Sequence, residues 1–247
     1  MNKPIIIWQP GLIGDICFLQ KMVEQIALMG HRVIFPLDSQ YSWIRDLLIR
    51  HPNIEMPLIT EDFDFRSEII TLNLPSKLSF QPIETNDFIF FSFYESWRFN
   101  PQRTMYMKYE MANMSYDNWQ DYVHIKRNTE KENDLFYNVL NLNDTSDFTL
   151  LNETYSRGYM ALTAPPPVVK MSVIPGYTLF DWSKVIEKAT RIVTVDTSLV
   201  LLAEILKTSA KLHVVSRYNP PDFSPIDALL KLKWQYALTP KELDFSK

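Results

Sequence analysis

The chain has 247 residues, of which 46% are hydrophobic and 22% charged, and its formal net charge is -4. This composition is typical of a globular protein, and the lack of a lysine- or arginine-rich run argues against binding to nucleic acid. Cys17 is the single cysteine and the four histidines are scattered, which excludes a disulfide framework and zinc-ligand spacing. No segment is long enough to span a membrane, and the apolar run at residues 4–8 is too short for a signal peptide, so we expect a cytoplasmic protein.

The first half of the chain alternates short apolar runs with segments of helical period. Residues 5–8 form a continuous apolar run, which predicts a strand buried on both faces. From Asp15 onward, apolar residues recur at spacings of three and four as far as Gly30, which predicts a helix that ends at a glycine. The elements predicted next are strands at 31–37, 53–59, 68–72 and 87–91 and a helix at 39–50. Strands that alternate with helices in this way predict right-handed crossovers and a parallel sheet.

Two segments in the middle of the chain interrupt this alternation. Residues 92–122 are rich in Tyr, Trp and Met and look helical; they could form core, a lid or a partner surface, and core is favoured. The charged run at 126–134 is expected to be the solvated start of a helix and to mark the boundary between two halves. We therefore predict an N-terminal Rossmann-like domain at 1–125, a linker at 126–146 and a C-terminal Rossmann-like domain at 147–247.

The second half repeats the alternation, with no detectable repeat in the sequence itself. The predicted strands are 148–151, 168–174, 191–195 and 211–215, and the predicted helices are 182–189, 198–206 and 226–232. The expected fold class is therefore α/β, with two Rossmann-like domains facing across a cleft that holds the working groups.

The turn after the first predicted strand is the first candidate site. Gly11, Gly14 and Asp15 lie between that strand and the first predicted helix, at the edge of a parallel sheet where ligands bind. Glycines let the backbone approach a ligand closely, and a helix N-terminus attracts anions. A structural interpretation is equally strong, because glycine suits the turn and Asp15 complements the helix dipole.

A dinucleotide site at this turn is a less favoured interpretation. Asp38 ends the second predicted strand, roughly where a ribose-binding carboxylate belongs. However, the glycine spacing is G-x-x-G rather than G-x-G-x-x-G, and Asp15 would repel the pyrophosphate.

The second candidate site is the sequence Asp196, Thr197 and Ser198, where a predicted strand runs into a predicted helix. Hydroxyl groups and backbone N–H groups at a helix start suit an oxyanion. From the local sequence alone, an ordinary helix N-cap is the favoured interpretation.

A weaker candidate is the pair Asp62 and Asp64, which has the Asp-x-Asp spacing used to hold a divalent metal on a nucleotide sugar. Such pairs also arise by chance in acidic loops. We therefore expect no metal site.

Taken together, the first two candidate sites resemble glycosyltransferase family 9, which is related to the bacterial ADP-heptose lipopolysaccharide heptosyltransferases. Members open with a strand, a Gly-x-x-Gly-Asp turn and a helix, as Gly11, Gly14 and Asp15 do here. Late in the C-terminal half they carry a strand that ends Val-Asp-Thr/Ser-Ser/Gly, before a helix with a Leu-Ala pair. Residues 195–198 and 202–203 match that pattern.

The resemblance implies the GT-B architecture, in which two Rossmann-like domains face each other across a cleft. It also implies that the nucleotide-sugar donor binds mainly to the C-terminal half and the acceptor mainly to the N-terminal half, with Asp15 as catalytic base. The chain departs from the family in being short and in two other ways. Leu201 stands where a histidine near the donor diphosphate is common, and Ser156 and Arg157 are the only polar candidates in place of a lysine-bearing loop.

The expected function is metal-independent transfer of a sugar from a nucleotide-diphosphate donor to an acceptor hydroxyl, with no other cofactor. Thr197, Ser198 and Arg157, together with backbone N–H groups, would hold the diphosphate, and Asp196 is expected to order the loop. Gly11 and Gly14 complete the predicted binding residues. Asp15 would take the proton of the attacking hydroxyl.

Two questions stay open at this point. The acceptor is a glycan, a lipid or a protein. The alternative function is a catalytically degenerate relative that binds a nucleotide or a protein partner in the same cleft, which Leu201 and the short C-terminal half favour.

Overall fold

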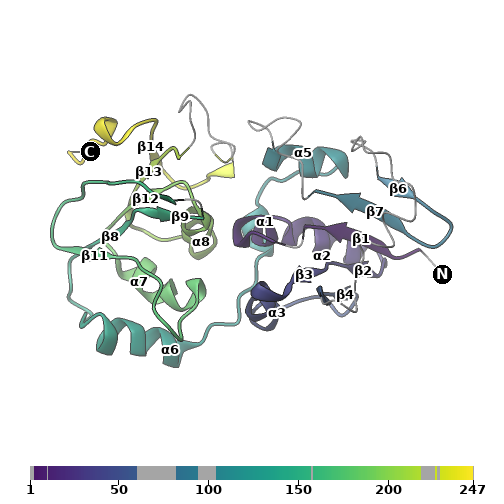
Figure 1. The fold of residues 1–247 in the computed structure, drawn as a ribbon, viewed down its shortest axis with the longest axis horizontal. Coiled ribbons are helices and arrows are strands. Elements are labelled where there is room, and N and C mark those ends of the chain that lie inside the picture. Colours follow the sequence, from purple (N-terminus) through teal and green to yellow (C-terminus); the bar gives the residue numbers. More distant parts are fainter. Residues whose placement is uncertain are drawn as a thin grey trace. The chain divides into compact units, whose positions relative to one another are not determined.

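The computed structural model describes residues 3–9, 11–59, 82–93, 104–156, 158–217, 226 and 229–246. The chain divides into two compact units, Met1–Lys126 and Arg127–Lys247, which are described separately (Figure 1). Within the described ranges, no helix is both long enough and apolar enough to cross a membrane.

The first unit is built around β1 (Ile5–Trp8), whose four residues are all buried. Five strands pair in the order β4-β2-β1-β7-β6, all parallel except β6, which runs antiparallel to β7 (Figure 1). The strands around β1 are β2 (Val33–Ile34), β4 (Ile54–Glu55), β6 (Ile83–Glu84) and β7 (Ile89–Ser92). A separate parallel pair is formed by β3 (Leu37–Asp38) and β5 (Leu58–Ile59). The continuous apolar run of β1 fits the centre of a sheet that is covered on both faces.

Helical segments follow the strands of this sheet. They are α1 (Ile13–Phe18), α2 (Gln20–Leu28), α3 (Ser42–Leu47) and α5 (Thr104–Met111), with 3-10 turns at Ser39–Tyr41 and Trp119–Tyr122. The ring of Phe18 at the end of α1 lies edge-on to the rings of Tyr109 and Trp119, with centroids 4.9 Å and 5.5 Å away. Because all three side chains are buried, this part of the aromatic segment is core, as its sequence favoured.

The second unit contains a parallel sheet with the strand order β11-β8-β12-β13-β14 (Figure 1). Its strands are β8 (Thr149–Asn152), β11 (Val168–Lys170), β12 (Arg191–Val195), β13 (Lys211–Val215) and β14 (Trp234–Ala237). In the register between β8 and β12, Asn152 lies opposite Thr194. A short antiparallel hairpin of β9 (Thr154–Tyr155) and β10 (Gly158–Tyr159) follows β8.

The helical segments of the second unit begin close to its first residue, Arg127. They are α6 (Thr129–Asn133), a π-helical turn (Asp134–Val139), α7 (Ser183–Lys188), α8 (Ser198–Leu206) and 3-10 turns at Leu179–Trp182 and Pro240–Glu242. Arg127 joins α6 to α7 by donating to Oε1 of Glu132 at 2.5 Å and to Oε1 of Glu187 at 2.7 Å. The helix expected to start in the charged run at 126–134 is present as the helical residues 129–139.

In the described strands, each of the two five-stranded sheets has one point at which the strand order reverses direction. In the first unit the chain builds outward from β1 through β2 and β4, and then returns to place β7 on the other side of β1. In the second unit β11 lies on one side of β8 and β12 on the other. Ligands of open α/β sheets bind outside the carboxyl ends of the strands at such switch points, here β1/β7 and β8/β12.

The predicted α/β class is confirmed by these two sheets. The predicted strand at 68–72 and residues 227–228 of the predicted helix at 226–232 lie outside the described residues. The domain boundaries and the cleft between the halves stay predictions.

Candidate functional site

The turn that connects β1 to α1 has a strained backbone. Gln9 donates from Nε2 to the carbonyl oxygen of Gly11 at 3.1 Å. A Cβ atom on Gly11 would lie 3.3 Å from Cε2 of Tyr41, so the close approach of that ring favours glycine. Leu12 has a φ of 69° and a ψ of 111°, although its side chain is 51% exposed. Such a conformation costs a non-glycine residue about 1–3 kcal/mol and is found most often at functional sites.

Asp15, in the first turn of α1, forms an ion pair with Lys108 of α5. The Nζ atom of Lys108 donates to Oδ1 of Asp15. The lysine side chain is 2% exposed and the aspartate side chain 14% exposed. Among the described residues, no hydrogen-bond donor meets Oδ2 of Asp15. One carboxylate oxygen is therefore anchored, and the other meets no donor in this part of the chain.

This ion pair links the two elements that follow the switch point of the first sheet. Asp15 comes after β1, and Lys108 comes after β7. The predicted residues Gly11 and Gly14 lie in the same turn and first helical turn as Asp15. Lys108 is not among the residues predicted from the sequence, because its only local signal is a lysine within the Met- and Tyr-rich run of α5.

The start of α8 carries the second group of predicted residues. The hydroxyl of Thr197 accepts a hydrogen bond from the backbone N–H of Leu199 at 3.4 Å and so caps the helix. It also accepts from Nδ2 of Asn152 at 3.2 Å, and the same Nδ2 donates to Oγ1 of Thr194 at 3.0 Å. Because Asn152 ends β8 and Thr194 lies in β12, this amide bridges the two strands of the second switch point.

The residues beside Thr197 differ in how far they reach solvent. Ser198 begins α8 and is half-buried. Asp196 is buried, with 2% of the residue exposed, which suits the ordering role expected for it. Leu201, at the position where the family commonly has histidine, is 4% exposed within the same helix.

A charged pair, Glu153 and Lys170, extends this polar network. Glu153 directly follows Asn152, accepts from Leu162 N at 2.9 Å, and accepts from Nζ of Lys170 at 3.0 Å. Burial raises the pKa of Glu153, but the hydrogen bonds from Leu162, Lys170 and Tyr159 outweigh it and hold this pKa below its ordinary value. Lys170 ends β11, and its side chain is 66% exposed, so a cation stands at the same edge of the sheet. Lys170 is not among the residues predicted from the sequence.

The remaining sequence-based candidates either lie outside the described residues or have a structural explanation. Arg157, Asp62 and Asp64 lie outside the described residues. Asp38 caps the 3-10 turn that follows β3, which accounts for its carboxylate without a ribose. In the part of the chain that the structure describes, no cluster of three or more His, Cys, Asp or Glu side chains could hold a metal ion.

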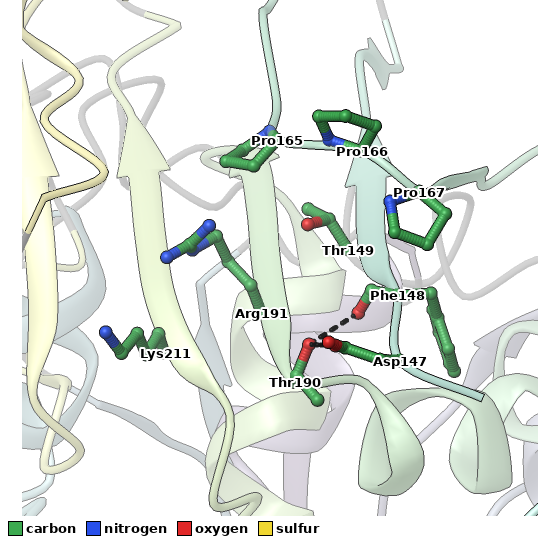
Figure 2. A pocket seen from close by; sticks show the side chains of 9 residues that line it. All are labelled: Asp147, Phe148, Thr149, Pro165, Pro166, Pro167, Thr190, Arg191 and Lys211. Atoms are coloured by element: carbon green, nitrogen blue, oxygen red, sulfur yellow. Dashed lines mark hydrogen bonds between the residues drawn. The ribbon is translucent and has the colours of Figure 1, made fainter. Parts of the chain in front are cut away.

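A cavity of about 280 Å³ lies at the opposite edge of the second sheet (Figure 2). Its lining residues come from the amino ends of β8, β11, β12 and β13 and from the loops before them: Asp147, Phe148, Thr149, Pro165, Pro166, Pro167, Thr190, Arg191 and Lys211. The hydroxyl of Thr190 donates hydrogen bonds to Oδ1 of Asp147 at 2.7 Å and to the carbonyl oxygen of Phe148 at 3.0 Å. Both are drawn in Figure 2. None of the predicted site residues that the structure describes lines this cavity, and ligands of parallel sheets bind at the other edge.

No protein-family model and no curated protein matches the sequence. Solved structures do match. The chain is similar to a glycosyl transferase family 9 protein from Veillonella parvula, with a TM-score of 0.54 and 12% identity over 96% of this chain and 86% of that chain. The iron-containing dodecameric glycosyltransferase TibC from enterotoxigenic E. coli gives a TM-score of 0.47 and 11% identity over 87% of this chain and 58% of that chain. The E. coli heptosyltransferase WaaC, whose structure was determined with ADP, gives a TM-score of 0.39 and 12% identity over 86% of this chain and 86% of that chain.

The likeness to the Veillonella parvula protein defines the class of fold. The chain has a glycosyltransferase fold, as the resemblance in its two short motifs implied. At 12% identity the likeness concerns the fold alone. What the protein does must therefore be argued from the side chains at the two switch points.

Proposed function

We propose that the chain is a glycosyltransferase of the family 9 type, which transfers a sugar from a nucleotide-diphosphate donor to an acceptor hydroxyl without a metal ion. The observation that carries this proposal is the carboxylate of Asp15, anchored through Oδ1 and available through Oδ2 at the switch point of the first sheet. The glycosyltransferase fold supports it, since the two short motifs of the resemblance lie at the two switch points.

The donor diphosphate would bind at the carboxyl edge of the second sheet. Backbone N–H groups at the start of α8, with the hydroxyls of Thr197 and Ser198, suit phosphate oxygens. Lys170 adds a cation close to this edge, and the Asn152 amide holds the Thr197 hydroxyl in place. Arg157, expected from the sequence to contribute, belongs to the proposal on that ground alone.

The proposed reaction is a single displacement. The acceptor oxygen forms a bond to the anomeric carbon of the donor, and the bond from that carbon to the diphosphate oxygen breaks with its electron pair on the diphosphate. Oδ2 of Asp15 takes the hydroxyl proton, which is worth about 10²–10⁴ in rate. Lys170 and the N–H groups of α8 stabilise the charge that develops on the diphosphate, which is the task that a bound cation performs in other enzymes.

One observation favours the second candidate function, a degenerate relative that binds a nucleotide without transfer. Leu201 is buried, with 4% of the residue exposed, so this position of α8 offers no polar side chain to a diphosphate. Both functions predict nucleotide binding, and only the first predicts turnover.

Turnover and binding can be separated in one set of assays. ADP-, UDP- and GDP-sugars are screened by thermal shift, where a ligand at a hundredfold its Kd adds about 2.7 kcal/mol of stability. The nucleotide sugar that binds is then incubated with the protein. Release of its nucleoside diphosphate is followed with and without EDTA. Release that continues in EDTA supports the proposal. Binding without release supports the degenerate relative, and activity that EDTA abolishes and Mn²⁺ restores contradicts metal independence.

A further inference from the structure

We infer that Lys108 is a positioning residue for the proposed base: it fixes Oδ1 of Asp15 so that Oδ2 faces the acceptor hydroxyl. The inference rests on the proposed function, and it assigns a role to a residue that lies in neither sequence motif.

The burial of Lys108 is the first observation. Its side chain is 2% exposed, and its described contacts are Oδ1 of Asp15 and, at 3.8 Å, the sulfur of Met105. Removing an ammonium group from water is costly unless a counter-charge meets it, and replacing a buried ion pair by packed apolar residues is often neutral or stabilising. Stability alone therefore gives little reason for a charged pair here, whereas orientation of the carboxylate does.

The second observation is that α5, which carries Lys108, is fixed to α1, which carries Asp15. Tyr109, the neighbour of Lys108 in α5, donates from its hydroxyl to the carbonyl oxygen of Phe18 at 2.6 Å, and the two rings pack edge-on. Phe18 is the last residue of α1, three positions after Asp15. Since α5 is fastened to α1 directly beside the ion pair, the ammonium and the carboxylate are held on elements that do not move apart easily.

The third observation is that the two carboxylate oxygens of Asp15 have different surroundings. With Oδ1 taken by the buried ammonium, rotation about the Cβ–Cγ bond of Asp15 is restricted and Oδ2 keeps one direction. Proton transfer needs a base that is already aligned, and misplacement by about 1 Å can cost about a hundredfold in rate. Lys108 then acts through Asp15 and needs no contact with the substrate.

The test is a double-mutant cycle on transfer, with kcat and KM measured for wild type, Lys108→Met, Asp15→Asn and the double variant. Lys108→Met keeps the length of the side chain and removes the charge, and we expect it to lower kcat about tenfold to hundredfold with KM for the donor within threefold. In the Asp15→Asn background the same change should lower kcat by less than twofold, because the group through which Lys108 acts is already lost. Lys108→Arg, which keeps the charge, should recover part of the rate.

Controls separate this role from a structural one. Lys126→Met, at an exposed position of the same unit, should leave kcat unchanged. If Lys108→Met does not fold, the neutral double variant is compared with Asp15→Asn and Lys108→Arg with wild type, because neither of these variants leaves one member of the pair charged and unpartnered. A double variant with a kcat well below that of Asp15→Asn would then overturn the inference. A folded Lys108→Met with the kcat of wild type overturns the inference and leaves the proposed function intact. An equal loss in both backgrounds also overturns it, since Lys108 would then act independently of Asp15. A wild-type protein that transfers no sugar overturns the proposed function, and the inference with it.

Discussion

Lys108 and Asp15 meet although they are 93 positions apart, because the elements that follow β1 and β7 come together at the switch point of the first sheet. Only Asp15 belongs to a recognisable motif, and its partner is supplied by a helix that shares no pattern with it. A carboxylate with one anchored oxygen and one available oxygen is the arrangement that a general base requires. The predictions below test this site and the matching one in the second unit.

We expect Leu12→Gly to leave the protein as stable as wild type or more stable. Glycine adopts a positive φ without strain, so relief of about 1–3 kcal/mol offsets the roughly 0.5–1 kcal/mol that glycine's flexibility costs. Leu28→Gly, at an exposed residue at the end of α2, is the matched control and should be destabilising. Urea unfolding of both variants gives the comparison. A Leu12→Gly protein that loses as much stability as Leu28→Gly would mean that the turn is not strained.

Lys170→Met should weaken binding of a nucleoside diphosphate by about tenfold, because a charged hydrogen bond to phosphate is worth roughly 1.5–3 kcal/mol and this side chain is largely exposed. The effect on the nucleoside without phosphates should be small. Calorimetry with both ligands measures the difference, and Lys233→Met, at an exposed position of the same unit, is the control. Equal loss of affinity for nucleoside and nucleotide would show that Lys170 does not meet the phosphates.

Glu153→Gln should remove part of the acid sensitivity of folding. The pKa of Glu153 lies below its ordinary value of 4.5, so the stability that its carboxylate contributes is present above about pH 4.5 and is lost as the pH falls through the folded-state pKa. The stability difference between wild type and Glu153→Gln should therefore be larger at pH 7 than at pH 3, as chemical denaturation can show. A difference that is constant between the two pH values contradicts the assignment.

Cys17 should resist thiol reagents while the protein is folded. The residue is buried in α1, two positions after Asp15, and burial raises the pKa of its thiol to about 12. At pH 8 the reactive thiolate is therefore scarce, and it is also out of reach. Labelling by a chromogenic disulfide should be slow in buffer and fast in denaturant. Rapid labelling in buffer would show that α1 opens readily. In that case the helix would not hold the Asp15 carboxylate in one orientation, which contradicts its proposed role as a base.

Much of the second unit could be predicted from its sequence, because local signals there agree with the fold. β12, α8 and β13 begin and end where their apolar runs and the Thr197 cap predict. The first predicted helix is in fact two, α1 and α2, separated at Leu19, since a break of one residue leaves the apolar spacing intact. The hairpin of β9 and β10 has two residues in each strand, too few for any periodicity.

The candidate site could be predicted only in its local parts. The residues next to β1 and at the start of α8 lie within short motifs, so the sequence alone selected Asp15 and Thr197. Lys108 and Lys170 reach their carboxylates through pairing between elements that are distant in the chain, which no local pattern contains. The strand order that brings them together is itself set by long-range pairing of short strands.

The turnover of Asp15→Asn tests the central claim most directly. The amide keeps the shape of the side chain and its contact with Lys108, but it cannot accept the acceptor proton. We expect kcat for sugar transfer to fall by about 10²–10⁴, with donor Kd within a few-fold and a loss of stability of about 3–5 kcal/mol, because the buried ammonium of Lys108 loses its counter-charge. Asp87→Asn, at an exposed aspartate of the same unit, should have the kcat of wild type. A folded Asp15→Asn protein that transfers sugar at the wild-type rate would contradict the account.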